Sequence, residues 1–378
     1  MKLSSLNPLR CDGTPLPPPI LLMCKLIVFC LMLRGYVEGI PEPFLPMLPM
    51  FDAIPRPDLF RQGSILIFLC ASVGLLFNRS VRTCALLAGA IFLLQPLTSR
   101  VTFFYGNFFC ASMLILSGLY DDRTGTLLHR AQFSIMYFGA GLGKLLDPDW
   151  HNGQFIDFWL SVKRPSALYE SLASGLPERW FAGLLSWSTI VIEFALAIGL
   201  MFPKISRTFV WCAIVFHTGS VVLSQHDFGV FIAALLAGML VFASWPERGQ
   251  VKVLYDRGNR VAGLMKRISG VVHHDGLFDW RPTPSSDGGI RALRMEWQAK
   301  IYTGYAVIQI WLLLNPLTYF VIATLLCSPN LSKRIHITLV QITLIGGAFC
   351  LFPWAEAFNN LRLGLRWIEA RVRCKSQH

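Results

Sequence analysis

Charged residues are scarce in this sequence. Asp, Glu, Lys and Arg together make up 15% of its 378 residues, whereas hydrophobic residues make up 54%. Soluble globular domains carry about 25% charged residues, and a chain with so few cannot cover a water-facing surface. The composition therefore excludes a cytosolic enzyme, a disordered protein and a secreted disulfide scaffold. It predicts an all-α polytopic membrane protein whose main solvent is lipid.

Several familiar site motifs are also missing. The sequence contains no GxGxxG, GxxxxGK, HExxH or GxSxG pattern. Its ten cysteines form no CxxC pair and no zinc spacing, and most lie inside apolar segments, where cysteine behaves as a small hydrophobic residue. His273 and His274 have no third ligand at metal spacing. We therefore predict neither a disulfide framework nor a metal site.

Basic residues outnumber acidic ones by 34 to 22, which gives a formal net charge of +12. No basic patch with interleaved aromatic residues accompanies this excess, so the sequence predicts no nucleic-acid binding. Lysine and arginine instead gather in alternate loops and in the tail, as they do in cytoplasmic loops that face anionic lipid headgroups. We expect a multi-pass protein of the cell membrane, with both termini cytoplasmic and the lipid bilayer as its partner.

Apolar runs long enough to cross a bilayer predict about ten transmembrane helices. The ninth contains Asn315-Pro316 and is expected to be broken or kinked there. A polar stretch between the eighth and ninth runs predicts a small cytoplasmic segment, possibly α+β. The ten runs are 19–37, 62–78, 83–99, 101–120, 131–146, 181–203, 206–225, 228–245, 301–327 and 335–354.

This pattern divides the chain into five expected parts. The first joins an N-terminal span to a proline-rich interfacial segment, and the second is the main transmembrane domain. The cytoplasmic segment, the last spans and a basic tail follow. The boundaries are 1–60, 61–245, 246–300, 301–354 and 355–378.

Ionisable residues inside spans are the most informative ones, because each costs roughly 3 kcal/mol or more in a bilayer. Lys144, Glu193 and His217 are the three that stand out. At helical spacing, Lys144 shares a face with Tyr137 and Gly141, and small residues there let a helix or a flat ligand approach closely. Lys144 is then either a base in a desolvated pocket or an anchor that snorkels to the interface and pairs with a nearby aspartate.

Polar stripes on the next two spans leave the same two alternatives open, a functional site or a structural contact. Glu193 shares a helical face with Ser186, and His217 shares one with Ser220. The stripes could line one intramembrane cavity and pair with each other or with Lys144, or they could be hydrogen bonds that fix packing. The expected depths in the membrane argue against an ion pair between Lys144 and Glu193, because Glu193 is expected near the midplane and Lys144 near the outer face. Asn107, the one amide of the fourth span, could face the same cavity or bond a neighbour.

The residues from Tyr137 to Gly153 resemble the signature of the HTTM membrane domain. They read YFGAGLGKLLDPDWHNG, an aromatic pair, a small-residue stretch, a lysine and then an acidic-x-Trp-x-x-Gly pattern. The domain occurs in vitamin K-dependent gamma-carboxylase and its bacterial relatives, and the similarity extends over roughly 60–245. The resemblance implies that Lys144 is the base toward a reduced quinone, with Glu193 and His217 as catalytic partners. Tyr137, Gly141 and Asn107 are then the expected ligand contacts.

The sequence departs from the carboxylase in two places. The stretch Leu119–Arg123 has no histidine where the carboxylase has a functional one, and no large extramembrane domain is present to hold a protein substrate. A second, weaker similarity links 251–300 to the DCC thiol-oxidoreductase module. Asn259 and Ala262 stand where that module has its CxxC cysteines, so dithiol chemistry is excluded there.

Two functions follow as hypotheses. In the first, the protein acts on a quinone-like or lipid-soluble substrate, with Lys144 as an intramembrane base. In the second, it is a non-catalytic membrane scaffold or partner-binding subunit. The sequence names neither a substrate nor a protein partner.

Overall fold

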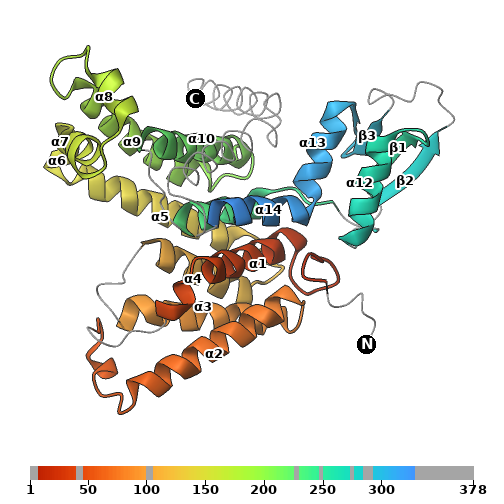
Figure 1. Ribbon diagram of the computed structural model, residues 1–378, viewed down its shortest axis with the longest axis horizontal. Coiled ribbons are helices and arrows are strands. Elements are labelled where there is room, and N and C mark those ends of the chain that lie inside the picture. The colour runs from red at the N-terminus through yellow and green to blue at the C-terminus, as the bar shows by residue number, and fades with distance from the viewer. Residues whose placement is uncertain are drawn as a thin grey trace, which may run out of the picture. The chain divides into compact units, whose positions relative to one another are not determined.

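The computed structural model divides the chain into two compact units (Figure 1). Unit 1 joins residues 1–120 to 243–327, and unit 2 contains residues 121–242. The structure describes residues 7–39, 46–98, 105–224, 230–246, 250–272, 276–283 and 293–327.

Four helices in the described part of the chain are long and apolar enough to cross a membrane. They are α2 (Pro57–Leu76), α3 (Val81–Thr98), α9 (Trp180–Gly199) and α10 (Ser206–Ser224). A fifth candidate is the pair α13 (Tyr305–Leu314) and α14 (Pro316–Cys327), which is bent by 75° at the break that Asn315-Pro316 predicts. The chain is therefore a membrane protein with four or five candidate spans.

The expectation of about ten spans is not supported. Two apolar runs form shorter helices, α1 (Pro18–Leu33) and α11 (Val230–Gly238), the latter continued by a 3-10 turn, Met239–Phe242. The described part of the fourth run, α4 (Tyr105–Gly118), has 14 residues. The fifth run forms α5 (Leu127–Leu145), which falls short in hydropathy because polar side chains accompany its apolar ones. The predicted span 335–354 and the tail 355–378 lie outside the described residues.

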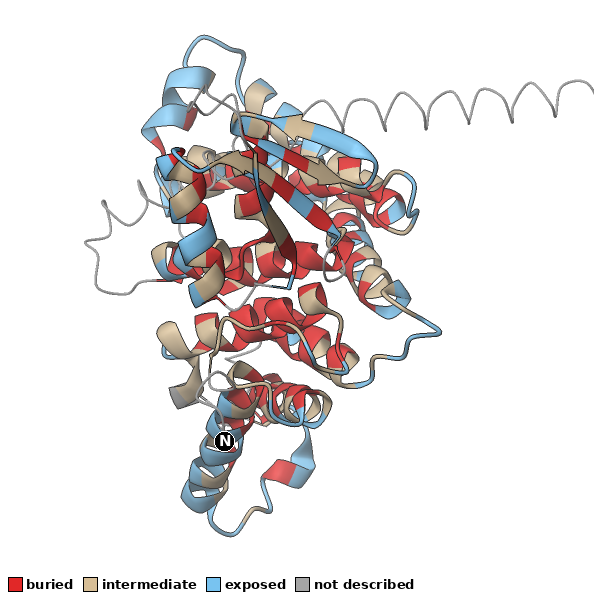
Figure 2. Ribbon diagram, turned by 90° about the vertical axis from the view of Figure 1, so that its right-hand side faces the viewer, coloured by how far each residue is buried: buried red, intermediate tan, exposed pale blue. Residues whose placement is uncertain are grey.

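In unit 1, α3 and α4 approach each other closely because two glycines face the partner helix. A Cβ atom on Gly89 would lie 2.8 Å from the backbone nitrogen of Ile115, and one on Gly118 would lie 2.8 Å from that of Leu86. This is the small-residue packing that membrane helices use where lipid supplies no hydrophobic drive. On α2, Leu66 and other large apolar side chains are exposed (Figure 2), as expected of a surface that lipid covers.

A small α/β module completes unit 1. Its sheet has the strand order β2-β1-β3-β4, with β1 and β2 parallel and the other two pairings antiparallel. Helix α12 makes the crossover between β1 and β2. The possible α+β character of this segment is thereby confirmed as a four-stranded mixed sheet. The elements are β1 (Val251–Asp256), α12 (Arg260–Val271), β2 (Phe278–Thr283), β3 (Arg294–Trp297) and β4 (Lys300–Thr303).

The run 301–327 is not one continuous helix: it breaks between α13 and α14, and α13 packs against this module. Val307, Ile310 and Trp311 of α13 lie in the same hydrophobic core as the strands, and the Trp311 indole donates to the Ser269 hydroxyl of α12 at 2.9 Å. At the start of α12, the Asn259 side chain accepts hydrogen bonds from the backbone of Val261 and Ala262. Asn259 thus caps the N-terminus of α12.

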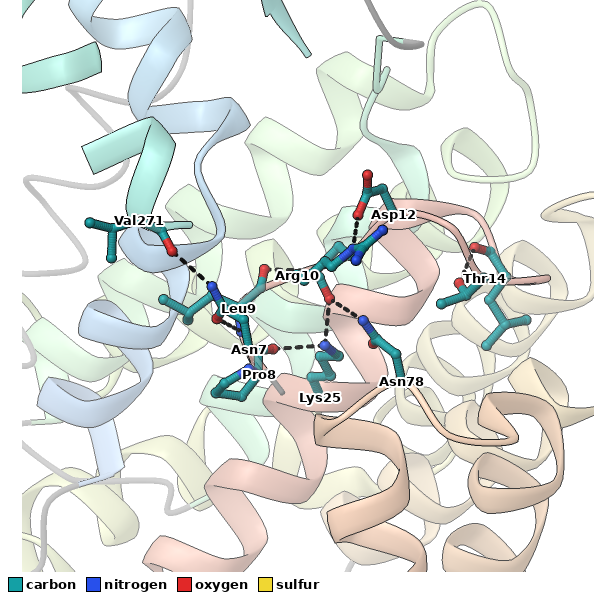
Figure 3. Close-up of polar contacts among 11 residues, drawn as sticks. Asn7, Pro8, Leu9, Arg10, Asp12, Thr14, Lys25, Asn78 and Val271 are labelled. Carbon is teal, nitrogen blue, oxygen red and sulfur yellow. Dashed lines mark hydrogen bonds and ion pairs between the residues drawn. The ribbon is translucent and has the colours of Figure 1, made fainter. Parts of the chain in front are cut away.

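The N-terminal segment is held by a lysine buried in α1 (Figure 3). Lys25 is fully buried, and its Nζ donates to the carbonyl oxygens of Pro8 at 2.7 Å and Arg10 at 2.6 Å. The Asn78 amide donates to the same Arg10 carbonyl at 2.9 Å, and Asn7 donates to Val271 of α12 at 2.8 Å. These bonds join the segment to α1, to the loop after α2 and to the module.

Replacing Lys25 with methionine is expected to lower the free energy of unfolding by about 2–3 kcal/mol. The side chain keeps its length, but the part-buried carbonyl oxygens of Pro8 and Arg10 lose a charged donor. Thermal unfolding in detergent measures the change. Lys266→Met is the matched control, because Lys266 is exposed on the same unit and should shift stability by at most about 0.5 kcal/mol. Equal melting of the two variants would contradict the anchoring role.

In unit 2, short helices between α5 and α9 build a local core. They are α6 (Pro148–His151), α7 (Gln154–Phe158), a π turn (Trp159–Lys163) and α8 (Ala167–Ala173). Their buried side chains, including Trp150 and Ile156, pack on Ala182 and Ile190 of α9. The Tyr169 hydroxyl donates to the Asp157 carboxylate at 2.7 Å. Burial raises the pKa of the Tyr169 hydroxyl well above its ordinary value, and the hydrogen bond to the Asp157 carboxylate raises it further.

Candidate functional site

An ion pair joins α5 to α9 inside unit 2. The Lys144 Nζ lies 2.8 Å from both carboxylate oxygens of Glu193, and it also donates to the Ala140 carbonyl at 3.3 Å. The side chain of Lys144 is 20% exposed and that of Glu193 is 9% exposed. The ammonium lies 5.1 Å from the centre of the Trp150 ring, within range of a cation–π interaction. Lys144 therefore pairs with Glu193 and not with a nearby aspartate.

The expected difference in depth between the two residues is resolved by their side chains. Helices α5 and α9 are antiparallel, since Ser134 donates to the carbonyl of Ala197 while Phe138 packs on Phe194. Helical side chains point toward the N-terminus of their helix, so Lys144 extends back along α5 and spans about one turn, roughly 5 Å. It reaches the level of Glu193 in this way.

A second polar contact joins α5 to α10. The Tyr137 hydroxyl and the His217 Nε2 are 2.9 Å apart and share a hydrogen bond, with both side chains buried. Phe231 packs edge-on against the His217 ring. Tyr137 and Lys144 lie two turns apart on one face of α5, so both contacts lie along that face. Four of the predicted site residues thus converge from three helices onto one polar cluster.

The other two predicted ligand contacts have different surroundings. Gly141 is buried where α5 crosses α9, and a Cβ atom on it would lie 3.3 Å from the Phe194 ring. Asn107 belongs to unit 1, where its amide donates to the Gln95 side chain of α3 at 3.2 Å. Its role toward a ligand stays a prediction.

The residues after Lys144 shape the turn that carries Trp150. Asp147 caps α6 by accepting a hydrogen bond from the backbone of Asp149 at 3.0 Å. Gly153 has a φ of +76°, and a Cβ atom on it would lie 2.5 Å from the backbone nitrogen of Gly183 in α9. Only glycine fits such a left-handed position against another backbone. The turn holds the Trp150 ring close to the ammonium of Lys144.

Sequence reasoning did not single out Trp150 as part of the charged site. An aromatic residue six positions after the lysine falls on a separate short helix, and no periodicity connects the two. The contacts of His151 have no periodic signal in the sequence either. This residue stacks on Trp187 and donates to the Leu145 carbonyl at 2.6 Å. These contacts depend on the turn at Asp147 and could not be predicted from a continuous helix.

The cluster consists of groups that can carry a proton. Over the described ranges, no group of three or more His, Cys, Asp and Glu side chains could hold a metal ion. Lysine, glutamate, histidine and tyrosine can instead move a proton among themselves or toward a bound molecule. The arrangement is therefore suited to proton transfer and to hydrogen bonding of a polar group inside an apolar unit.

Residues 124–245 match the family model of the HTTM domain. The match includes residues 124–242 of unit 2 and is narrower than the predicted range of 60–245. The protein is thus a membrane protein that carries an HTTM domain, and the polar cluster lies within it. Neither the curated proteins nor the solved structures contain a match to this chain.

Proposed function

We propose that the HTTM domain binds a lipid-soluble molecule with an acidic hydroxyl, of the reduced-quinone class, and that Lys144 takes its proton. The polar cluster of Tyr137, Lys144, Glu193 and His217 carries this proposal. Ionisable residues in apolar helices are costly and are kept where they serve a function. The resemblance of the surrounding signature to the vitamin K-dependent carboxylase favours the quinone class.

The ion pair gives Lys144 a route to act as a base. With the proton on Lys144, the pair is ionic, and burial makes that state expensive. With the proton on Glu193, the lysine amine is neutral and can accept a proton from a hydroxyl. In this scheme, Glu193 controls whether Lys144 is protonated. The ammonium that forms when Lys144 takes the proton of the ligand hydroxyl would stabilise the oxyanion left on the ligand.

Two further groups can orient a bound ring. The Tyr137–His217 pair offers a second hydrogen-bonding group near the first. The Ser186 hydroxyl, two turns before Glu193 on the same face of α9, is buried with no hydrogen-bond partner in the described part of the chain. A buried hydroxyl without a partner costs free energy, which supports a polar ligand at this face.

A second function has a specific observation in its favour. Lys144 is already satisfied by Glu193, Ala140 and Trp150, and Asp147 and Gly153 both shape the turn that packs on α9. Such contacts would also suit a non-catalytic membrane subunit in which the signature holds the helices together. In both cases, we propose that the protein lies in the cell membrane with its termini in the cytoplasm.

Ligand binding separates the two functions. We expect a panel of reduced quinones to raise the melting temperature of the wild-type protein in detergent, and Lys144→Ala and Lys144→Arg to lose this shift. Lys163→Ala is the control, because Lys163 is exposed on the same unit away from the cluster, and it should keep the shift. If no reduced quinone stabilises the wild type, the quinone proposal fails and the subunit function gains support.

A further inference from the structure

Helix α12 packs on the sheet of the small α/β module with one face and leaves the opposite face exposed. The packed face contributes Ala262 and Met265 to the hydrophobic core of the module. The exposed face recurs every three or four residues, as helical spacing requires, and alternates arginine with a large apolar side chain. The two apolar side chains are 58% and 70% exposed. This open face of α12 consists of Arg260, Leu264, Arg267 and Val271.

The open face carries positive charge that nothing balances. Helix α12 contains no acidic residue, and in the described part of the chain Arg260 and Arg267 have no ion-pair partner. The exposed face of the sheet, on the other side of the module, differs because two ion pairs balance charge there. These are Lys252–Glu296 at 3.9 Å and Arg281–Asp279 at 2.8 Å. Balanced charges suit water, whereas unpaired arginines beside exposed apolar side chains suit an anionic membrane surface.

The C-terminal end of α12 is held close to the end of a candidate span. Val271, the last residue of the helix, accepts a hydrogen bond from the Asn7 side chain through its carbonyl at 2.8 Å. Three residues further along the chain, the Arg10 carbonyl accepts one from Asn78, which follows α2 (Figure 3). The same short segment thus joins α12 to the loop after α2. With the N-terminus in the cytoplasm, this is the side of the inner leaflet, whose lipids carry negative charge.

We propose that the open face of α12 docks on an anionic lipid leaflet. Leu264 and Val271 enter the boundary between headgroups and acyl chains, and Arg260 and Arg267 bind lipid phosphates. Arginine suits this role because its guanidinium matches phosphate oxygens and its long side chain reaches the headgroups from a partly inserted helix. A leaflet is favoured over an acidic protein because α13 joins the module directly to the last candidate span, which keeps lipid at high effective concentration.

A photo-crosslinking side chain tests the contact in the full-length protein. Leu264 is replaced by p-benzoylphenylalanine, and the protein is reconstituted in vesicles of phosphatidylcholine with or without phosphatidylserine. After illumination, we expect mass spectrometry to find lipid attached to the α12 peptide, with a yield that rises with phosphatidylserine and falls in high salt. Ile301 is the matched control position. It is 69% exposed and lies opposite Glu296 in the register of β3 and β4, on the other side of the module, so it should give no lipid adduct.

Charge variants show whether the arginines direct the docking. Arg260→Gln and Arg267→Gln should each lower the lipid adduct at position 264 by up to about five-fold in phosphatidylserine vesicles, whereas Arg281→Gln on the sheet should leave it unchanged. Adducts at position 264 with protein alone, or none at all, would overturn the proposal, as would equal lipid adducts at positions 264 and 301. Equal yields with and without phosphatidylserine would overturn the assignment of anionic lipid.

Discussion

Replacing Glu193 with leucine is expected to lower the free energy of unfolding by about 3 kcal/mol, because it leaves the Lys144 ammonium without its carboxylate partner. Breaking a buried ion pair from one side costs about 3–5 kcal/mol. The lower end applies here, since the Lys144 side chain keeps 20% exposure and a contact with Trp150. Lys144→Met should cost more, because the Glu193 carboxylate that remains is only 9% exposed.

The double variant Lys144→Met with Glu193→Leu decides what the pair does. Replacing both charged partners by apolar residues of similar volume is often neutral or stabilising, so the double variant should unfold within about 1 kcal/mol of wild type. Thermal or denaturant unfolding in detergent measures all three variants. If the stable double variant no longer binds reduced quinones, the pair serves a ligand and not the fold.

Glu178→Leu is the control for this cycle. Glu178 belongs to the same unit, and its side chain is 87% exposed, so the change should stay within about 0.5 kcal/mol. Single variants at Lys144 and Glu193 that unfold like wild type would show that the lysine reaches water when its partner is removed. That result would favour the anchor interpretation of Lys144.

Much of the site could be predicted from helical periodicity. The face of α5 that carries Tyr137 and Lys144, and the faces that carry Glu193 and His217, follow from residues that recur every turn. Pairing among them was one of the alternatives that the sequence left open. Whether Lys144 pairs with Glu193 depends on how far the lysine side chain reaches along its helix, which helical periodicity does not describe.

The number of spans could not be predicted equally well. Hydropathy does not distinguish a helix that faces lipid from one that lies in a protein core. Helix α13 shows the difference, because its apolar residues pack on the strands and Trp311 bonds Ser269. The break at Asn315-Pro316 was predictable, since proline ends a helix locally, but the direction of the chain before it depended on tertiary contacts.

Two glycines of the same signature, Gly143 and Gly153, should respond in opposite directions to replacement by alanine. Gly153→Ala is expected to destabilise the protein by more than about 3 kcal/mol. The left-handed conformation costs an L-residue about 1–2 kcal/mol, and the new methyl group would meet the backbone of Gly183 at 2.5 Å, which no rotamer can relieve. The turn would have to move away from α9, and Trp150 would move away from Lys144 with it.

Gly143→Ala should instead leave stability unchanged or raise it by up to about 1 kcal/mol. Gly143 lies in the regular part of α5 with no atom within 4 Å of an added Cβ, and alanine is the better helix former. Thermal unfolding of the two variants side by side measures the contrast, and tryptophan fluorescence reports the environment of Trp150. If both variants lost stability equally, the signature glycines would be conformationally equivalent, and the close approach of the Gly153 turn to α9 would not hold.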